Sequence, residues 1–140
     1  MRTRMAAFLL CLTLLAPAAF ACSCIQLTAK ENFEAADAVL VGKVIRLEVT
    51  KEHQGVSTIE ATVRVIEARK GKFTAGQEVT FVTDDGCCYC SYSYVIAGTY
   101  LLYANAEEQR WSTSSCMRSG LVHEPDVKAD LKELGFARLR

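Results

Sequence analysis

Six of the seven cysteines in this 140-residue chain follow residue 21, and they constrain the fold more than any other feature. They are Cys22, Cys24, Cys87, Cys88, Cys90 and Cys116. An even number of cysteines in a small exported chain predicts a disulfide framework, because a small domain has only a modest core to hold it together. The sequence by itself leaves the pairing of the six open.

A metal site is the alternative interpretation of this cysteine cluster. The spacing of Cys87, Cys88 and Cys90 matches no standard zinc motif, and the chain has only two histidines, His53 and His123. We therefore expect disulfides and no bound cofactor. Neither histidine has a catalytic partner at a useful spacing, and no phosphate loop, serine elbow or zinc-protease motif is present, so no enzymatic activity is predicted.

The first 21 residues have the pattern of a cleaved secretory signal. Two arginines give a positive start, an apolar stretch runs from Met5 to Ala16, and Ala19-Phe20-Ala21 places small residues where a signal peptidase reads. The stretch is too short for a membrane span of about 20 residues. We expect residues 1–21 to be removed, and residues 22–140 to form one secreted or periplasmic domain without a membrane span.

Lipoprotein anchoring at Cys22 is a less favoured alternative. A lipidation box prefers Leu at position 19 and a small residue at position 20, where this chain has Ala19 and Phe20. Lipidation would acylate the α-amine of Cys22 and use its sulfur, which would leave an odd number of cysteines for disulfides.

Charge and hydropathy patterning indicate a mainly β domain that does not bind nucleic acid. The 16 basic and 16 acidic residues balance, so no basic patch is expected. Thr28 and Glu31 form a capping box that predicts a helix over Ala29–Ala36, with Phe33 as its main buried residue. Alternating apolar residues predict a hairpin whose strands are joined by a polar turn at Lys51–Gly55. The predicted strands are 38–49, 57–68, 78–83, 100–104 and 110–116, and a last helix is predicted between Pro125 and Gly135.

Several of these residues carry a resemblance to a known family. Cys22-Ser23-Cys24, placed directly after the expected cleavage site, resembles the start of the tissue inhibitors of metalloproteinases, which carry a netrin-like module. Cys90 with Tyr94, Gly98–Ala104 and Ser112–Cys116 are similar to the central strands of that module, and the last helix is similar to that of bacterial members. The resemblance implies an OB-like five-stranded antiparallel β-barrel with a short N-terminal helix and a C-terminal helix.

The resemblance also implies a disulfide pairing. Carried over to this chain, Cys22 pairs with Cys90 and Cys24 pairs with Cys116. Cys87 and Cys88 are left without an assigned partner.

The function implied by the resemblance is inhibition of zinc metalloendopeptidases. The α-amine and carbonyl of Cys22 would chelate the catalytic zinc of the target protease, and Ser23 would point into its specificity pocket. The other residues of this inhibitory edge would be Cys24, Ile25, Gln26, Cys88 and Tyr89. The expected partner is a zinc metalloprotease, bound by a monomer. The alternative is a non-inhibitory netrin-like module that binds a protein or a glycan of the cell envelope.

Overall fold

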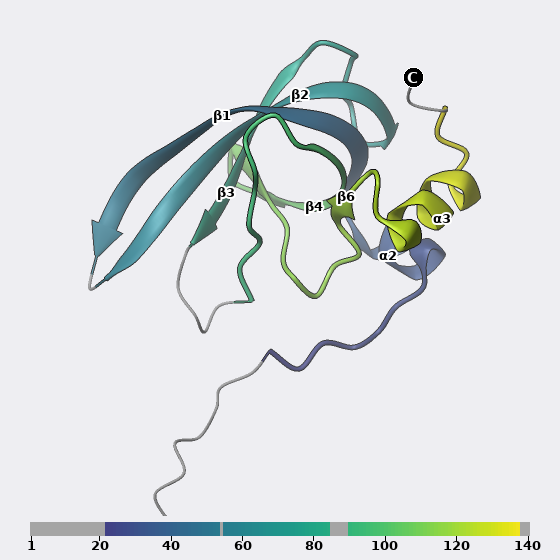
Figure 1. The fold of residues 1–140 in the computed structure, drawn as a ribbon, viewed down its shortest axis with the longest axis horizontal. Coiled ribbons are helices and arrows are strands. Elements are labelled where there is room, and N and C mark those ends of the chain that lie inside the picture. The colour runs from purple at the N-terminus through teal and green to yellow at the C-terminus, as the bar shows by residue number, and fades with distance from the viewer. Residues whose placement is uncertain (1–21, 54, 85–89, 138–140) are drawn as a thin grey trace, which may run out of the picture.

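The computed structural model describes residues 22–53, 55–84 and 90–137, and it is mainly β, as predicted (Figure 1). The first helix, α2 (Ala29–Ala35), precedes the long strands β1 (Ala38–His53) and β2 (Val56–Lys70). The remaining elements are β3 (Glu78–Asp84), β4 (Thr99–Glu107), β5 (Arg110–Ser112), β6 (Gly120–Leu121) and α3 (Pro125–Glu133).

Among the described residues, five strands form a closed ring of pairings in the order β1-β2-β3-β5-β4, with β4 pairing back to β1. The short β6 adds to β4 outside this ring. Within the ring, β3 and β5 pair in parallel, so the prediction of a wholly antiparallel arrangement is wrong at this point. The reason is geometric: strand direction must alternate around an antiparallel ring, and an odd number of strands cannot alternate without one parallel pair.

The sheet is buried on both faces where β1 and β4 run beside the helices. Leu40, Val44 and Leu102 belong to the core inside the ring. Val39 and Tyr103 point the other way and form a second cluster with residues of α3 and the C-terminal segment. This double burial explains why 38–41 and 101–104 are continuous apolar runs without polar alternation.

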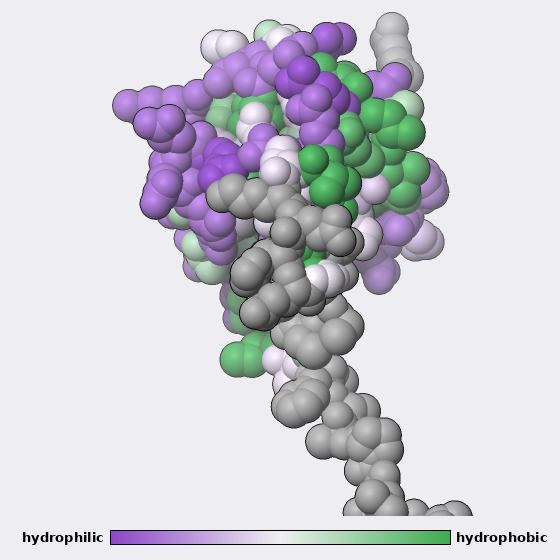
Figure 2. Space-filling model, turned by 90° about the vertical axis from the view of Figure 1, so that its left-hand side faces the viewer, coloured by the Kyte–Doolittle hydropathy of each residue, from purple (hydrophilic) through white to green (hydrophobic). Residues whose placement is uncertain are grey.

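The β1–β2 hairpin is longer than the sequence predicted. The predicted turn at Lys51–Gly55 is wrong in its first part, because residues 51–53 continue β1 and pair with 56–58 of β2. Gly55 has a φ of 79°, the left-handed conformation that favours glycine at a turn. Polar side chains do not end a strand whose backbone hydrogen bonds are met by its partner. Seen from the hairpin side, hydrophilic residues gather on the left and top of the visible surface and hydrophobic residues on its upper right (Figure 2).

The capping box that begins α2 is present as predicted. The amide of Glu31 donates to Oγ1 of Thr28 at 3.2 Å, and the amide of Thr28 donates to Oε2 of Glu31 at 2.8 Å. The amide and then the hydroxyl of Thr28, which both donate to Oε2 of Glu31, hold the pKa of Glu31 below its usual value. The prediction for Phe33 is wrong: it is only partly buried, whereas Ala29 and Asn32 are buried. Asn32 is held there because its side-chain amide donates to the carbonyl of Thr28.

Removing the cap should measurably weaken the fold. We expect Thr28→Ala to lower the free energy of unfolding by about 1 kcal/mol, because Oγ1 of Thr28 accepts an amide hydrogen of the first turn that would otherwise lack a partner. Urea unfolding followed by circular dichroism measures the change. Lys30→Ala, an exposed change in the same turn, is the matched control and should leave the urea midpoint unchanged. Equal midpoints for both variants would contradict the role of the cap.

Candidate functional site

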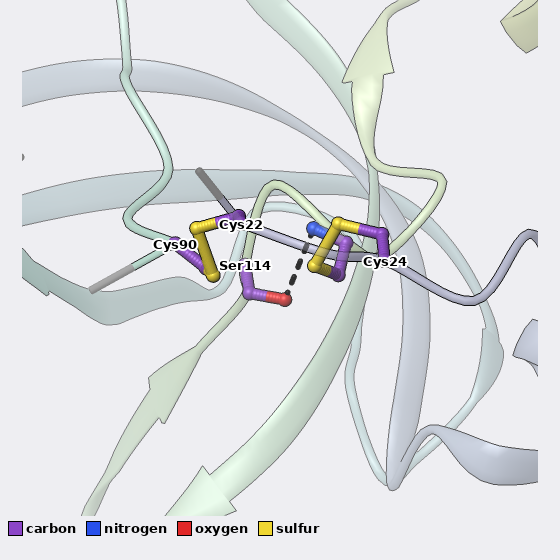
Figure 3. The surroundings of a disulfide bond; sticks show 5 residues. Cys22, Cys24, Cys90 and Ser114 are labelled. Atoms are coloured by element: carbon purple, nitrogen blue, oxygen red, sulfur yellow. Dashed lines mark hydrogen bonds between the residues drawn. A yellow bond between two sulfur atoms is a disulfide. The ribbon is translucent and has the colours of Figure 1, made fainter. Parts of the chain in front are cut away.

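The N-terminal segment, residues 22–28, is fastened to the strand ring by disulfides (Figure 3). Cys22 bonds to Cys90 with 5.7 Å between their Cα atoms, and Cys24 bonds to Cys116 with 5.0 Å. This is the pairing that the family resemblance implies. The segment has no regular secondary structure, and it runs below the strands in Figure 1 before it enters α2.

The two anchor points on the ring are joined to each other by backbone hydrogen bonds. The amide of Ser115 donates to the carbonyl of Cys90 at 2.9 Å. The amide of Cys116 donates to Oγ of Ser114 at 3.3 Å, which Figure 3 shows as a dashed line, and the amide of Met117 donates to the carbonyl of Ser114. This anchor turn, residues 114–117, therefore holds both disulfides in one local unit.

Hydrogen bonds of the residues that flank the anchor turn connect it to β4 at the centre of the sheet. Oγ of Ser119 accepts from the amide of Tyr103 at 2.9 Å and donates to the carbonyl of the same residue. The buried hydroxyl of Thr113 shares a 2.9 Å hydrogen bond with Ser119. Both ends of the anchor turn are therefore positioned by β4, whose residues in this region are among the most buried of the described chain.

The chain after Cys90 is held by an aromatic cluster. The rings of Tyr92 and Tyr94 lie 5.1 Å apart, and Tyr94 lies 5.7 Å from Tyr100. Burial raises the pKa of Tyr92 and of Tyr94 well above the usual value, so both phenols stay neutral at physiological pH. These rings pack against the core inside the strand ring and so hold the chain that follows Cys90 in place.

The side chains of the N-terminal segment are accessible to a partner. Cys22, Ser23 and Gln26 are exposed, Cys24 is half-buried, and Ile25 is 81% exposed. The side chain of Ile25 therefore presents apolar surface to solvent on a segment held by disulfides. Of the predicted inhibitory edge, residues 22–26 thus lie together on one clamped segment.

Several predicted features lie outside the described residues. They are the signal segment 1–21, the unassigned Cys87 and Cys88, and Tyr89. The proximity of Cys88 and Tyr89 to the edge stays a prediction. Among the described residues, no group of three His, Cys, Asp or Glu side chains is placed to hold a metal ion, and no helix is long and apolar enough to cross a membrane.

Sequence reasoning missed a polar pocket of about 410 Å³ on the outer face of the ring. Asn105, Glu107, Arg110 and Ser112 contribute to it from β4 and β5. A signal was present in the sequence: polar residues at alternate positions on both sides of the Glu108-Gln109 turn must share one face of a hairpin.

Comparison with known proteins adds no relative to this description. No protein-family model matches the chain, and no curated protein matches it.

Proposed function

We propose that this chain inhibits zinc metalloendopeptidases, and that residue 22 binds the catalytic zinc of the target. The observation that supports the proposal best is the double clamp: disulfides from Cys22 and Cys24 hold an exposed segment at Cys90 and at the anchor turn, which a backbone hydrogen bond joins. The start Cys22-Ser23-Cys24 resembles that of the tissue inhibitors of metalloproteinases, and the closed ring is compatible with the OB-type barrel of their netrin-like module.

The chemistry requires cleavage after Ala21, which creates a free α-amine at Cys22. This amine and the carbonyl oxygen of the same residue can chelate one metal ion in a five-membered ring. The catalytic zinc of a protease keeps one position open for water, and the chelating residue would displace that water. An α-amine has an ordinary pKa of about 7.7 to 8.0, so a neutral fraction able to bind zinc exists at pH 7.

The clamp would raise affinity by ordering the segment in advance. A flexible terminus loses conformational entropy when it binds, whereas a terminus fixed by disulfides loses less. Ser23, exposed between the two bonds, would enter the specificity pocket, and the exposed side chain of Ile25 would add apolar contact next to it. Disulfides persist in oxidising compartments, which agrees with action outside the cytoplasm.

A one-residue extension tests the proposal. The mature chain, which starts at Cys22, is compared with the same chain carrying an additional alanine before Cys22. Inhibition is measured as the loss of cleavage of a fluorogenic peptide by thermolysin and by a matrix metalloproteinase catalytic domain. We expect the extension to raise the inhibition constant by more than about 1,000-fold, a loss of about 4 kcal/mol in binding free energy, because the amine is converted into an amide.

The matched control places the additional alanine after Arg140, where inhibition should be unchanged. Circular dichroism and thermal unfolding should show that all three proteins fold alike. Full inhibition by the chain extended before Cys22 would rule out chelation. Absence of inhibition by the mature chain would instead favour the non-inhibitory binding module.

A further inference from the structure

The outer-face pocket lies where the parallel strands β3 and β5 stop pairing. They pair only at Phe81 with Trp111 and at Val82 with Ser112 within the described chain. Phe81 and Trp111 pack in the core of the ring, so their neighbours Val82 and Ser112 face outward. Beyond this point β3 continues to Asp84, whereas the segment that follows β5 turns away from it through Ser114. The pocket lies between these two segments.

The register of β4 against β5 brings further polar side chains to the same face. Asn105 lies opposite Ser112, and Glu107 lies opposite Arg110. Since alternate residues of a strand share one face, Asn105, Glu107, Arg110 and Ser112 all lie on the outer side with Asp84.

These side chains have hydrogen-bonding capacity to spare. The carboxylate of Glu107 has no hydrogen bond or ion pair within the described part of the chain, and Asp84 accepts the hydroxyl of Thr58 at only one of its two oxygens. The guanidinium of Arg110 gives one nitrogen to Glu60 at 2.6 Å, and it has five N–H donors in total. The pocket therefore offers acceptors on Asp84 and Glu107 and N–H donors on Arg110.

Charge and polarity narrow the class of ligand. Arg110 is already paired with Glu60, so the carboxylates of Asp84 and Glu107 leave the pocket with negative charge that would repel phosphate, sulfate or a uronic acid. Of the described residues that line the pocket, all except Val82 and Cys90 are polar or charged, which disfavours an apolar ligand. A sugar hydroxyl both donates and accepts, and a volume of about 410 Å³ is within the range of small-ligand sites.

We propose that this pocket binds one neutral sugar unit, a hexose or an N-acetylhexosamine. The site does not need the α-amine of Cys22, so it is separate from the chelating function. Cys90 and Ser114 belong both to its wall and to the clamp, which places a bound sugar beside the N-terminal segment.

Titration of the mature chain with methyl glycosides tests the site. The probes are the methyl glycosides of glucose, galactose, mannose and N-acetylglucosamine, followed by amide NMR shifts and by saturation transfer to the sugar. At least one should shift the amides of 105–112. Asn105→Ala and Glu107→Ala should each weaken binding about tenfold, as expected for loss of one hydrogen bond, while both variants keep the wild-type melting temperature.

Three controls make the test decisive. Glu133→Ala, an exposed acidic change on α3, should leave sugar binding unchanged. Sorbitol and methyl glucuronide should not bind, the first because it has no ring and the second because of its charge. Absence of shifts with all four sugars, equal binding of sorbitol, or binding that both pocket variants leave intact would overturn the proposal. The chain extended by alanine before Cys22 should still bind sugar, which separates this result from the inhibition result.

Discussion

Replacing the Cys24–Cys116 disulfide with serines, as Cys24→Ser with Cys116→Ser, is expected to lower the free energy of unfolding by about 3 to 4 kcal/mol. In the chain-entropy account a disulfide stabilises by restricting the unfolded chain, and the loss grows with the length of the loop that it closes. Urea unfolding of the mature chain under non-reducing conditions measures the effect.

The expected loss is set by the way in which the two disulfide loops overlap. With 92 residues of separation, the Cys24–Cys116 bond would contribute nearly 5 kcal/mol if it were alone. When the Cys22–Cys90 bond is intact, however, the shortest covalent path between Cys24 and Cys116 runs through it and closes a loop of only about 30 residues. When one bond is intact, the other therefore contributes about 3 to 4 kcal/mol to the free energy of unfolding. Loss of both bonds should cost about 8 kcal/mol, which is most of the stability of an ordinary domain.

The comparison needs a background in which no other thiol can take part. Cys87→Ser and Cys88→Ser in every protein remove exchange with the remaining cysteines. Ser115→Ala, an exposed change next to Cys116, controls for disturbance of the anchor turn and should cost less than about 0.5 kcal/mol. If the disulfide variant is no less stable than this control, the Cys24–Cys116 bond does not stabilise the folded protein.

Local signals in the sequence were enough to predict most of the elements. The capping box at Thr28 placed the start of α2, and Pro125 and Gly135 bracketed α3, because caps and turn residues act on their own neighbours. Gly135 has a φ of 72° just beyond that helix, which is the conformation its glycine was expected to provide.

Features that depend on distant partners were the ones missed. The parallel pairing of β3 with β5 follows from closing a ring of five strands among the described residues, and no short stretch of sequence contains that information. The error at Phe33 has a local cause instead: Asn32 is buried in α2, and its side-chain amide donates to the carbonyl of Thr28 four residues earlier. The length of the hairpin was underestimated because cross-strand backbone pairing extends the strands through a run of residues that are polar in the sequence.

The same distinction between local signals and distant partners applies to the candidate site and to the pocket. The residues at 22–26 stand together in the sequence, so their pattern could be recognised there, whereas the disulfide partners came from the family resemblance rather than from spacing. The outer-face pocket draws residues from β3, β4, β5 and the chain around Cys90, and only the register of the strands brings them together.

The second large effect is expected at a buried ion pair that joins α3 to the sheet. The side chain of Asp130 is only 3% exposed, and it accepts from two nitrogens of Arg118, at 2.6 and 2.8 Å, and from the hydroxyl of Tyr103 at 3.0 Å. Burial, and then the charge of Asp130, raises the pKa of Tyr103, so its hydroxyl remains a donor. We expect Arg118→Met to lower the free energy of unfolding by about 3 to 5 kcal/mol, because it leaves a buried carboxylate without its counter-charge.

Removing the acid instead should cost less, and this asymmetry is the test of the explanation. After Asp130→Leu the charge of Arg118 can still reach water, since its side chain is 33% exposed, and only the hydroxyl of Tyr103 is left without its acceptor. The double variant, Arg118→Met with Asp130→Leu, should be more stable than Arg118→Met alone because no charge is left buried. Urea unfolding of the three variants, with the exposed change Lys128→Met on α3 as control, measures the order. If the double variant loses the sum of the two single losses, the pair contributes through packing at two independent positions rather than through charge compensation.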